Sequence, residues 1–228
     1  MVITKNFEII SRKFDSSINY SVDEAVDKAK DLKFSNFDES LDIAVCLGVD
    51  PRHADQNIRV STTLPHGTGK SVRVLVIAEG EKQKEAKDAG ADYVGKEFLS
   101  KLKEGWSDVE KIVATPDMMP ELGKLGKVLG PKGLMPNPKS GTVTLDVGKA
   151  VKSLKAGQIE LRVEKNGIVH AQCGKLSFEN KMLVENIMTI YDALLKSKPS
   201  SVKGTYIKNM SISSTMGPGI KLNINNFQ

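Results

Sequence analysis

A glycine- and lysine-containing run in the first third of the chain has the residue types of a nucleotide-binding loop. Gly69, Lys70 and Ser71 match the end of the P-loop, in which backbone amides and a lysine hold phosphates. That motif also needs a glycine where Leu64 stands and a helix after it, whereas the sequence predicts a following strand. A nucleotide-binding enzyme that uses Gly67–Ser71 is therefore an alternative, which equilibrium binding of ATP or GTP would test.

The histidines and cysteines lack the spacing of catalytic or metal-binding sites. His53, His66 and His170 lie in separate segments without metal-ligand or catalytic-triad spacing. Cys46 and Cys173 each fall in a predicted strand without a CxxC partner, so we expect reduced thiols. The sequence thus predicts a protein that is not an enzyme, with no cofactor and no metal site.

The segment 123–141 combines glycines, three prolines and several lysines with no acidic residue. Glycine lets backbone amides approach another surface closely, and interspersed lysines suit an array of phosphates. The candidate nucleic-acid contacts here are Lys124, Lys127, Lys132 and Lys139. A long surface loop with merely solvated lysines remains an equal alternative. We expect little regular secondary structure in this segment, which is typical of a functional or mobile loop.

The C-terminal stretch 193–228 contains no acidic residue, because Asp192 is the last acid of the chain. Five lysines follow Asp192 with no acid to neutralise them. Within the stretch, hydroxyl side chains precede an apolar turn; they belong to Ser211, Ser213, Ser214 and Thr215, and the turn is Met216–Gly219. Hydroxyls bind phosphates and ribose 2′-OH groups, methionine packs on a base or sugar, and glycine permits close approach. This composition favours an RNA-binding surface over a solvated hairpin.

The overall composition fits one basic face on an otherwise mixed surface. The 33 basic and 28 acidic residues give a net charge of +5, which is too small for a chain threaded deep among phosphates. Aromatic residues make up only 5%, so recognition should depend on RNA shape and backbone rather than base stacking. No apolar run approaches the roughly 20 residues of a membrane span, and Met1–Ser11 lacks the apolar region of a signal peptide. We expect a cytoplasmic protein that is monomeric when free.

Two helices and several half-buried strands are predicted at the two ends of the chain. Ser21 and Glu24 have the spacing of a capping box and predict a helix over 22–33. The longest helix is predicted over 178–196, where leucines and isoleucines form one stripe. Alternating apolar and polar residues predict strands near 41–47, 58–62, 159–163, 168–173, 204–213 and 220–224.

The middle of the chain has a different pattern. The nearly continuous apolar run 72–78 precedes a helical stretch 81–89, and buried-strand signals recur near 90–94 and 111–115. Strand, helix and strand in this order indicate a parallel sheet.

The predicted fold class is therefore α/β with two domains. One is a discontinuous, split α+β domain of residues 1–66 and 159–228. The other is an inserted, Rossmann-like three-layer α/β domain of residues 67–158. Two adjacent chain crossings between them would form a natural hinge.

Several motifs in the same order make the chain resemble, over nearly its whole length, the family of bacterial large-subunit ribosomal protein L-one. The matching runs are Lys33–Glu39, Gly48–Arg52, Asp55–Asn57, Leu64–Gly67, Ala114–Asp117, Leu129–Pro138 and Thr215–Pro218. The resemblance implies that the split domain grips a folded site in the stalk region of large-subunit rRNA, while the inserted domain moves about a hinge. It also implies a mobile ribosomal stalk that assists release of E-site tRNA, and a repressor that binds its own operon mRNA.

The resemblance further implies which residues bind RNA. They are Phe37, Ser40, Lys165, Asn166, Gly167, His170, Ser211, Thr215, Met216 and Gly217. The lysines of 123–141 become secondary RNA or tRNA contacts. The remaining alternative is a general nucleic-acid chaperone that binds single strands without selecting a fold, which equal affinities for structured and scrambled RNA would favour.

Overall fold

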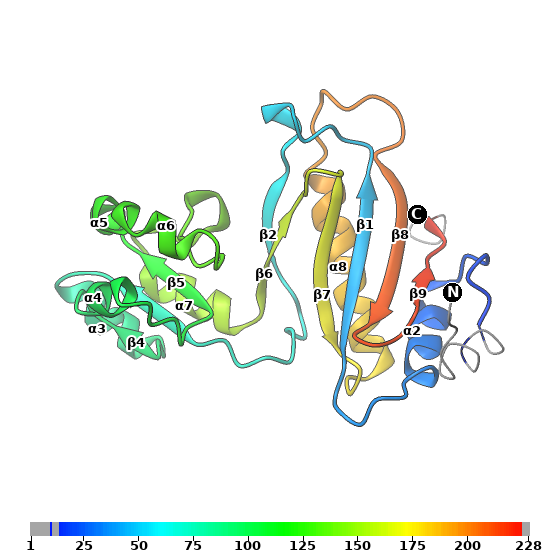
Figure 1. Ribbon diagram of the computed structural model, residues 1–228, viewed down its shortest axis with the longest axis horizontal. Helices are drawn as coiled ribbons and strands as arrows, with labels where there is room; N and C mark the ends of the chain where they lie inside the picture. The colour runs from blue at the N-terminus through cyan, green and yellow to red at the C-terminus, as the bar shows by residue number, and fades with distance from the viewer. Residues whose placement is uncertain (1–9, 11–13, 225–228) are drawn as a thin grey trace. The chain divides into compact units, whose positions relative to one another are not determined.

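The computed structural model describes residue 10 and residues 14–224 of the chain (Figure 1). Internal contacts divide the chain into two compact units: unit 1 is Met1–Gly69 with Glu160–Gln228, and unit 2 is Lys70–Ile159. The fold is mixed α/β, with antiparallel pairing in unit 1 and a parallel three-stranded sheet in unit 2.

Unit 1 contains a four-stranded antiparallel sheet in the order β7-β1-β8-β9. Its strands are β1 (Ser40–Leu47), β7 (Ile168–Lys175), β8 (Ile207–Ser214) and β9 (Gly219–Lys221). A two-stranded sheet pairs β2 (Arg59–Thr63) with β6 (Gln158–Arg162), and η1 (Ala54–Gln56) is a short 3-10 helix before β2. The predicted alternation in β1 is confirmed, because every second residue from Leu41 to Leu47 is buried. One face of the sheet therefore belongs to the core.

Helices α2 (Val22–Asp31) and α8 (Asn180–Lys196) pack on this apolar face, with α8 running behind β7 and β1 (Figure 1). The predicted capping box is present, since Ser21 and Glu24 each accept a hydrogen bond from the other's backbone N–H. In α8 the predicted stripe is fully buried, as in Leu183 and Leu194. Both predicted helices are confirmed.

Unit 2 is built on a parallel sheet in the order β4-β3-β5. The strands are β3 (Val74–Ile77), β4 (Tyr93–Val94) and β5 (Lys111–Ala114). The helices are α3 (Glu81–Asp88), α4 (Phe98–Lys103), α5 (Met119–Lys124), α6 (Gly126–Leu129) and α7 (Val147–Lys155), with 3-10 turns η2 (Pro116–Met118) and η3 (Pro138–Ser140).

The sheet of unit 2 has an apolar core on each face. In β3, Leu75 and Ile77 belong to one buried cluster, whereas Val74 and Val76 belong to another. The first cluster contains residues of α4, α5 and α6, and the second contains residues of α3 and α7. Because both faces are covered, β3 appears in the sequence as a continuous apolar run rather than an alternating one.

The expectation of little regular structure in 123–141 is wrong. Helix α5 ends within the segment, α6 follows directly, and η3 lies near its end. Leu125, Leu129 and Leu134 are buried in the core of unit 2 together with Leu122. These leucines anchor the segment, which leaves its lysines on the surface.

Candidate nucleic-acid interface

The face of the unit 1 sheet that turns away from α2 and α8 carries polar side chains in rows across the strands. Ala44 pairs with His170 on one side and with Ser211 on the other, and Ser211 pairs with Lys221. Paired residues on neighbouring strands share a face. His170, Ala44, Ser211 and Lys221 therefore form one row, which ends in exposed cationic or titratable groups at both edges.

A second row of paired residues on the same face lies two residues nearer the start of β1. Asp42 pairs with Gln172 and with Ser213. The Gln172 amide donates hydrogen bonds to the Ser40 hydroxyl at 3.3 Å and to the Thr68 carbonyl oxygen at 3.3 Å. The open face thus offers hydroxyl, amide and carboxylate groups on a hydrogen-bonded, rigid support.

The start of β1 is tied to the end of β8 by Thr215. The Thr215 backbone N–H donates to the Ser40 carbonyl oxygen at 3.1 Å, and the Ser40 N–H donates to Thr215 Oγ1 at 3.0 Å. The predicted RNA contacts Ser40 and Thr215, which are 175 residues apart in the chain, therefore lie side by side.

A buried carboxylate lies beneath this junction. The side chain of Glu39 is fully buried, and its Oε2 accepts the Met216 backbone N–H at 3.0 Å while Oε1 accepts the Ser35 hydroxyl. Burial alone would raise the pKa of Glu39. The hydrogen bonds from Ser35, Ser214 and Met216, with the charge of Lys33, outweigh burial and hold the pKa below its ordinary value. Glu39 is therefore an ionised group held by two separate segments.

Two large apolar side chains remain in solvent at this end of the sheet. Phe37 is 51% exposed and Met216 is 54% exposed, although each belongs to a segment held by Glu39. Gly217 is required next to them, because a Cβ there would lie 2.4 Å from Ser214 Oγ, which accepts the Gly217 N–H at 3.0 Å. Exposed apolar groups on a fixed turn suit packing against a ribose or base.

The sequence predicted that the Ser214 hydroxyl faces outward, and this prediction is wrong. Its side chain is buried, because its Oγ accepts the Gly217 N–H and also hydrogen bonds with Glu39. Ser211 and Ser213 stay partly exposed and Thr215 is exposed. Ser214 shapes the turn, whereas the other hydroxyls face solvent.

The predicted hairpin residues lie at the other end of β1. Gly167 accepts the Leu47 backbone N–H at 2.9 Å, and its φ of +75° and its nearness to Val49 favour glycine. Since a strand rises roughly 3.3 Å per residue, the turn Lys165–Gly167 lies about 23 Å from Ser40. His170 belongs to the row that crosses the sheet between these two ends. The predicted residues therefore share one sheet but occupy two separate ends of it.

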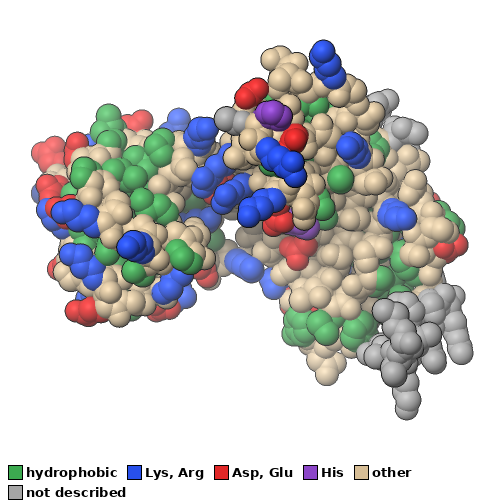
Figure 2. All heavy atoms as spheres, turned by 45° about the horizontal axis from the view of Figure 1, so that its top comes forward, with side chains coloured by type: hydrophobic (Ala, Val, Ile, Leu, Met, Phe, Trp, Pro, Cys, Tyr) green, Lys and Arg blue, Asp and Glu red, His purple; other side chains and the backbone are tan. Residues whose placement is uncertain are grey.

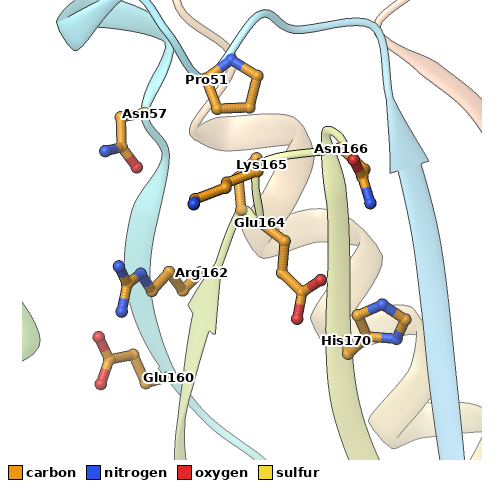
Figure 3. A pocket seen from close by; sticks show the side chains of 9 residues that line it. Pro51, Asn57, Glu160, Arg162, Glu164, Lys165, Asn166 and His170 are labelled. Atoms are coloured by element: carbon orange, nitrogen blue, oxygen red, sulfur yellow. The ribbon is translucent and has the colours of Figure 1, made fainter. Parts of the chain in front are cut away.

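A hollow of about 680 Å³ adjoins the hairpin on this face (Figure 3). Its lining residues are Pro51, Asn57, Glu160, Arg162, Val163, Glu164, Lys165, Asn166 and His170. Glu160 is neutralised by an ion pair with Arg59, whereas Arg162 and Lys165 have no ion pair among the residues that the structure describes. Figure 2 shows lysine and arginine side chains gathered with histidine on the part of unit 1 turned toward the viewer. The hollow can receive a negatively charged or hydrogen-bonding group.

Sequence reasoning missed Arg162 and Asn57 as members of this hollow. Asn57 lies in one of the runs that carried the family resemblance, so a signal for it was present. Arg162 has no such signal, because it enters the hollow that His170 also lines only where the chain turns back and Val163, just after β6, bridges to Val169 of β7.

The four predicted lysines of unit 2 are all exposed. Lys124 lies in α5, Lys127 in α6 and Lys139 in η3. Lys132 Nζ donates to the Gly105 carbonyl oxygen at 3.4 Å, which holds that side chain on the surface of its own unit. These cations are spread over several turns and face solvent.

The P-loop comparison fails at the level of structure as well. The residues after Ser71 continue into β3 rather than into a helix. The segment is held to unit 1 instead, since the Asn186 amide donates to the Gly67 carbonyl oxygen at 3.0 Å.

Among the described residues, no group of His, Cys, Asp and Glu side chains is arranged to hold a metal ion. Burial raises the pKa of the Cys173 thiol, and Asp42 adds to this effect, so that thiol is unreactive.

The described helices include none that is long and apolar enough to cross a membrane. Nearly the whole chain, residues 26–218, matches the family model described as the ribosomal protein L1p/L10e family. The match includes all of unit 2, most of unit 1 and every predicted RNA contact. The chain therefore belongs to the ribosomal protein L1p/L10e family, as an RNA-binding, non-enzymatic protein of the large ribosomal subunit that serves in translation.

Proposed function

We propose that unit 1 is the discontinuous rRNA-binding domain and that it grips a folded site in the stalk region of large-subunit rRNA through the open face of its sheet. The observation that carries this proposal is the meeting of Ser40 and Thr215, with Phe37 and Met216 exposed beside them. Segments from the two ends of the chain thereby contribute to one polar surface that presents two apolar side chains.

The two ends of β1 favour a structured RNA over a short single strand. RNA that contacts both Met216 and the Lys165–Gly167 turn must follow a surface about 23 Å long, at roughly 3.3 Å per strand residue. The β-sheet between these ends is rigid, so it suits a partner of fixed shape. Hydroxyl and amide groups then contact ribose and phosphate without reading the base sequence directly.

The cations supply attraction that depends on salt. Arg162 and Lys165 at the hollow and Lys221 at the far edge are exposed on or beside the open face. Each phosphate that they neutralise releases counterions, which makes affinity fall as salt rises.

In this proposal unit 2 is the inserted, Rossmann-like domain of the mobile stalk. Its exposed lysines Lys124, Lys127, Lys132 and Lys139 contact E-site tRNA and assist its release. The same face of unit 1 binds a site in the protein's own operon mRNA that is folded like the rRNA site, and thereby represses translation. The support for these roles is family membership together with the exposure of the lysines.

Chemical footprinting on purified large-subunit rRNA tests partner and site together. We expect one protected, folded region, and weaker protection by a variant in which Met216 is replaced by alanine. A scrambled RNA strand of the same length is the control. Equal affinity for the folded fragment and the scrambled strand would support a general nucleic-acid chaperone instead.

A further inference from the structure

We propose that Glu39 is a positioning residue for RNA recognition, which holds the Phe37 segment and the Met216 turn in one binding geometry. The inference rests on the proposed function of unit 1. Glu39 itself is fully buried, so it acts through the groups that it binds.

The hydrogen-bond partners of Glu39 come from two distant parts of the chain. Ser35 precedes Phe37 by two residues, while Ser214 and Met216 belong to the turn after β8. The contact between Glu39 and Met216 spans 177 residues of sequence. One carboxylate thus links both exposed apolar side chains of the proposed interface.

Stability is not the only reason for an ionised group at this position. A buried carboxylate loses its hydration, and replacing buried charged groups with apolar residues of similar volume is often neutral or stabilising. The benefit of Glu39 is geometric: it fixes the Met216 N–H and the Ser214 hydroxyl, which in turn accepts the Gly217 N–H.

Fixing this turn before binding raises affinity. The sequence Gly217-Pro218-Gly219 follows Met216, and glycine gives a chain greater conformational freedom than other residues do. An unanchored turn would have to be ordered when RNA binds, at the expense of affinity. Glu39 orders it in the free protein instead.

The test compares the full-length protein with the Glu39→Gln variant, which keeps the side-chain volume and removes the charge. We expect about tenfold weaker binding to purified bacterial large-subunit rRNA, the factor that corresponds to a hydrogen bond to a charged group. The salt dependence of binding should not change, because no phosphate contact is lost. Met216 and Gly217 amide hydrogens should exchange faster with solvent, both with and without RNA.

Glu24→Gln is the matched control, because it removes the same charge from the capping box of α2 and leaves the Met216 turn intact. It should lower stability without weakening RNA binding. Lys165→Ala is the opposite control, since loss of a phosphate contact should reduce the salt slope by about one.

Several results would overturn the role of Glu39. Unchanged rRNA affinity of a folded Glu39→Gln protein, or unchanged amide exchange at Met216, would each refute it. If that variant does not fold, Ser35→Ala decides, because it keeps the carboxylate and removes one donor. It should weaken binding about threefold, as expected for one ordinary hydrogen bond, and wild-type affinity would refute the inference. Failure of the wild-type protein to bind rRNA would instead overturn the proposed function and leave the amide-exchange test valid.

Discussion

Met216 presents a large apolar side chain to solvent, although the backbone that carries it is firmly held. Replacing Met216 with alanine should weaken rRNA binding by about 1–3 kcal/mol, the usual range for a packing contact at the centre of an interface. Because the side chain is 54% exposed, the melting temperature should stay close to that of the wild type. Equilibrium binding and thermal unfolding measure the two effects separately.

Leu195→Ala is the matched control for Met216. Leu195 is 48% exposed but lies in α8, on the covered side of the sheet. Its truncation should leave rRNA affinity unchanged. Equal losses in the two variants would show that exposed apolar area, rather than the proposed interface, governs binding.

Glu39 should also make stability depend on pH. Its pKa in the folded protein lies below the ordinary value of 4.5, so the unfolded chain binds the proton more tightly. The stabilisation is therefore complete above about pH 4.5 and is lost as pH falls through the lower, folded pKa. Urea unfolding at a series of pH values should show the difference between wild type and Glu39→Gln shrinking below pH 4.5. A constant difference would contradict this account.

At the scale of the elements, the sequence predicted those whose signal is local. The capping box of α2, the apolar stripe of α8 and the alternation of β1 each lie within a few turns or residues. Helix α7 was missed although Val147, Val151 and Leu154 recur at helical spacing, because Gly148 and β-branched valines weaken helix propensity. Glycine residues likewise weakened the helical signal of α5 and α6 in the sequence.

The arrangement of the interface was only partly predictable, because it depends on strand pairing. The hydroxyl run 211–215 was visible in the sequence, but the inward turn of Ser214 follows from its contacts with Gly217 and Glu39. Strand order places Thr215 beside Ser40 and the hairpin at the opposite end of β1. Neither result can be derived from composition or periodicity, which carry no information on register.

The β6–β7 hairpin should contribute mainly electrostatic affinity. Arg162→Ala and Lys165→Ala should each weaken rRNA binding and reduce the slope of log affinity against log salt by about one. Lys196→Ala, at the end of α8, is the control and should change neither quantity. Titrations at several salt concentrations measure the slope. A loss of affinity with an unchanged slope would show that these side chains position the hairpin rather than contact phosphate.

The segment that leads from unit 1 into unit 2 is fastened by one buried amide. Asn186 donates to the carbonyl oxygens of Gly67 and Cys173 at 3.0 and 2.7 Å and accepts the His66 N–H at 3.3 Å. Asn186→Ala leaves these groups unsatisfied and should lower the free energy of unfolding by about 1–3 kcal/mol. Denaturant unfolding measures this loss. Thr189→Ala, a smaller change at an exposed hydrogen bond of the same helix, should have a much weaker effect.

At the scale of the whole molecule, each unit has its own core and its own sheets, so unit 1 should fold without unit 2. In unit 1 the helices α2 and α8 pack on each other and on the strands β7 and β8, whereas the cores of unit 2 form around β3 and β5. Replacing 70–157 with a flexible glycine-serine linker keeps β6 intact and should leave a cooperatively folded protein. Circular dichroism and thermal unfolding would detect loss of the fold, which would contradict the split-domain interpretation.

The shortened protein should also retain most of the rRNA affinity, because the proposed contacts lie in unit 1. Introducing Met216→Ala into the shortened protein should weaken rRNA binding by about 1–3 kcal/mol, the usual size of such a contact. The loss should equal that in the full chain. Equal costs in both backgrounds would place recognition within unit 1, since distant and independent sites act additively. A much smaller cost in the shortened protein would mean that unit 2 takes part in fixing the Met216 turn.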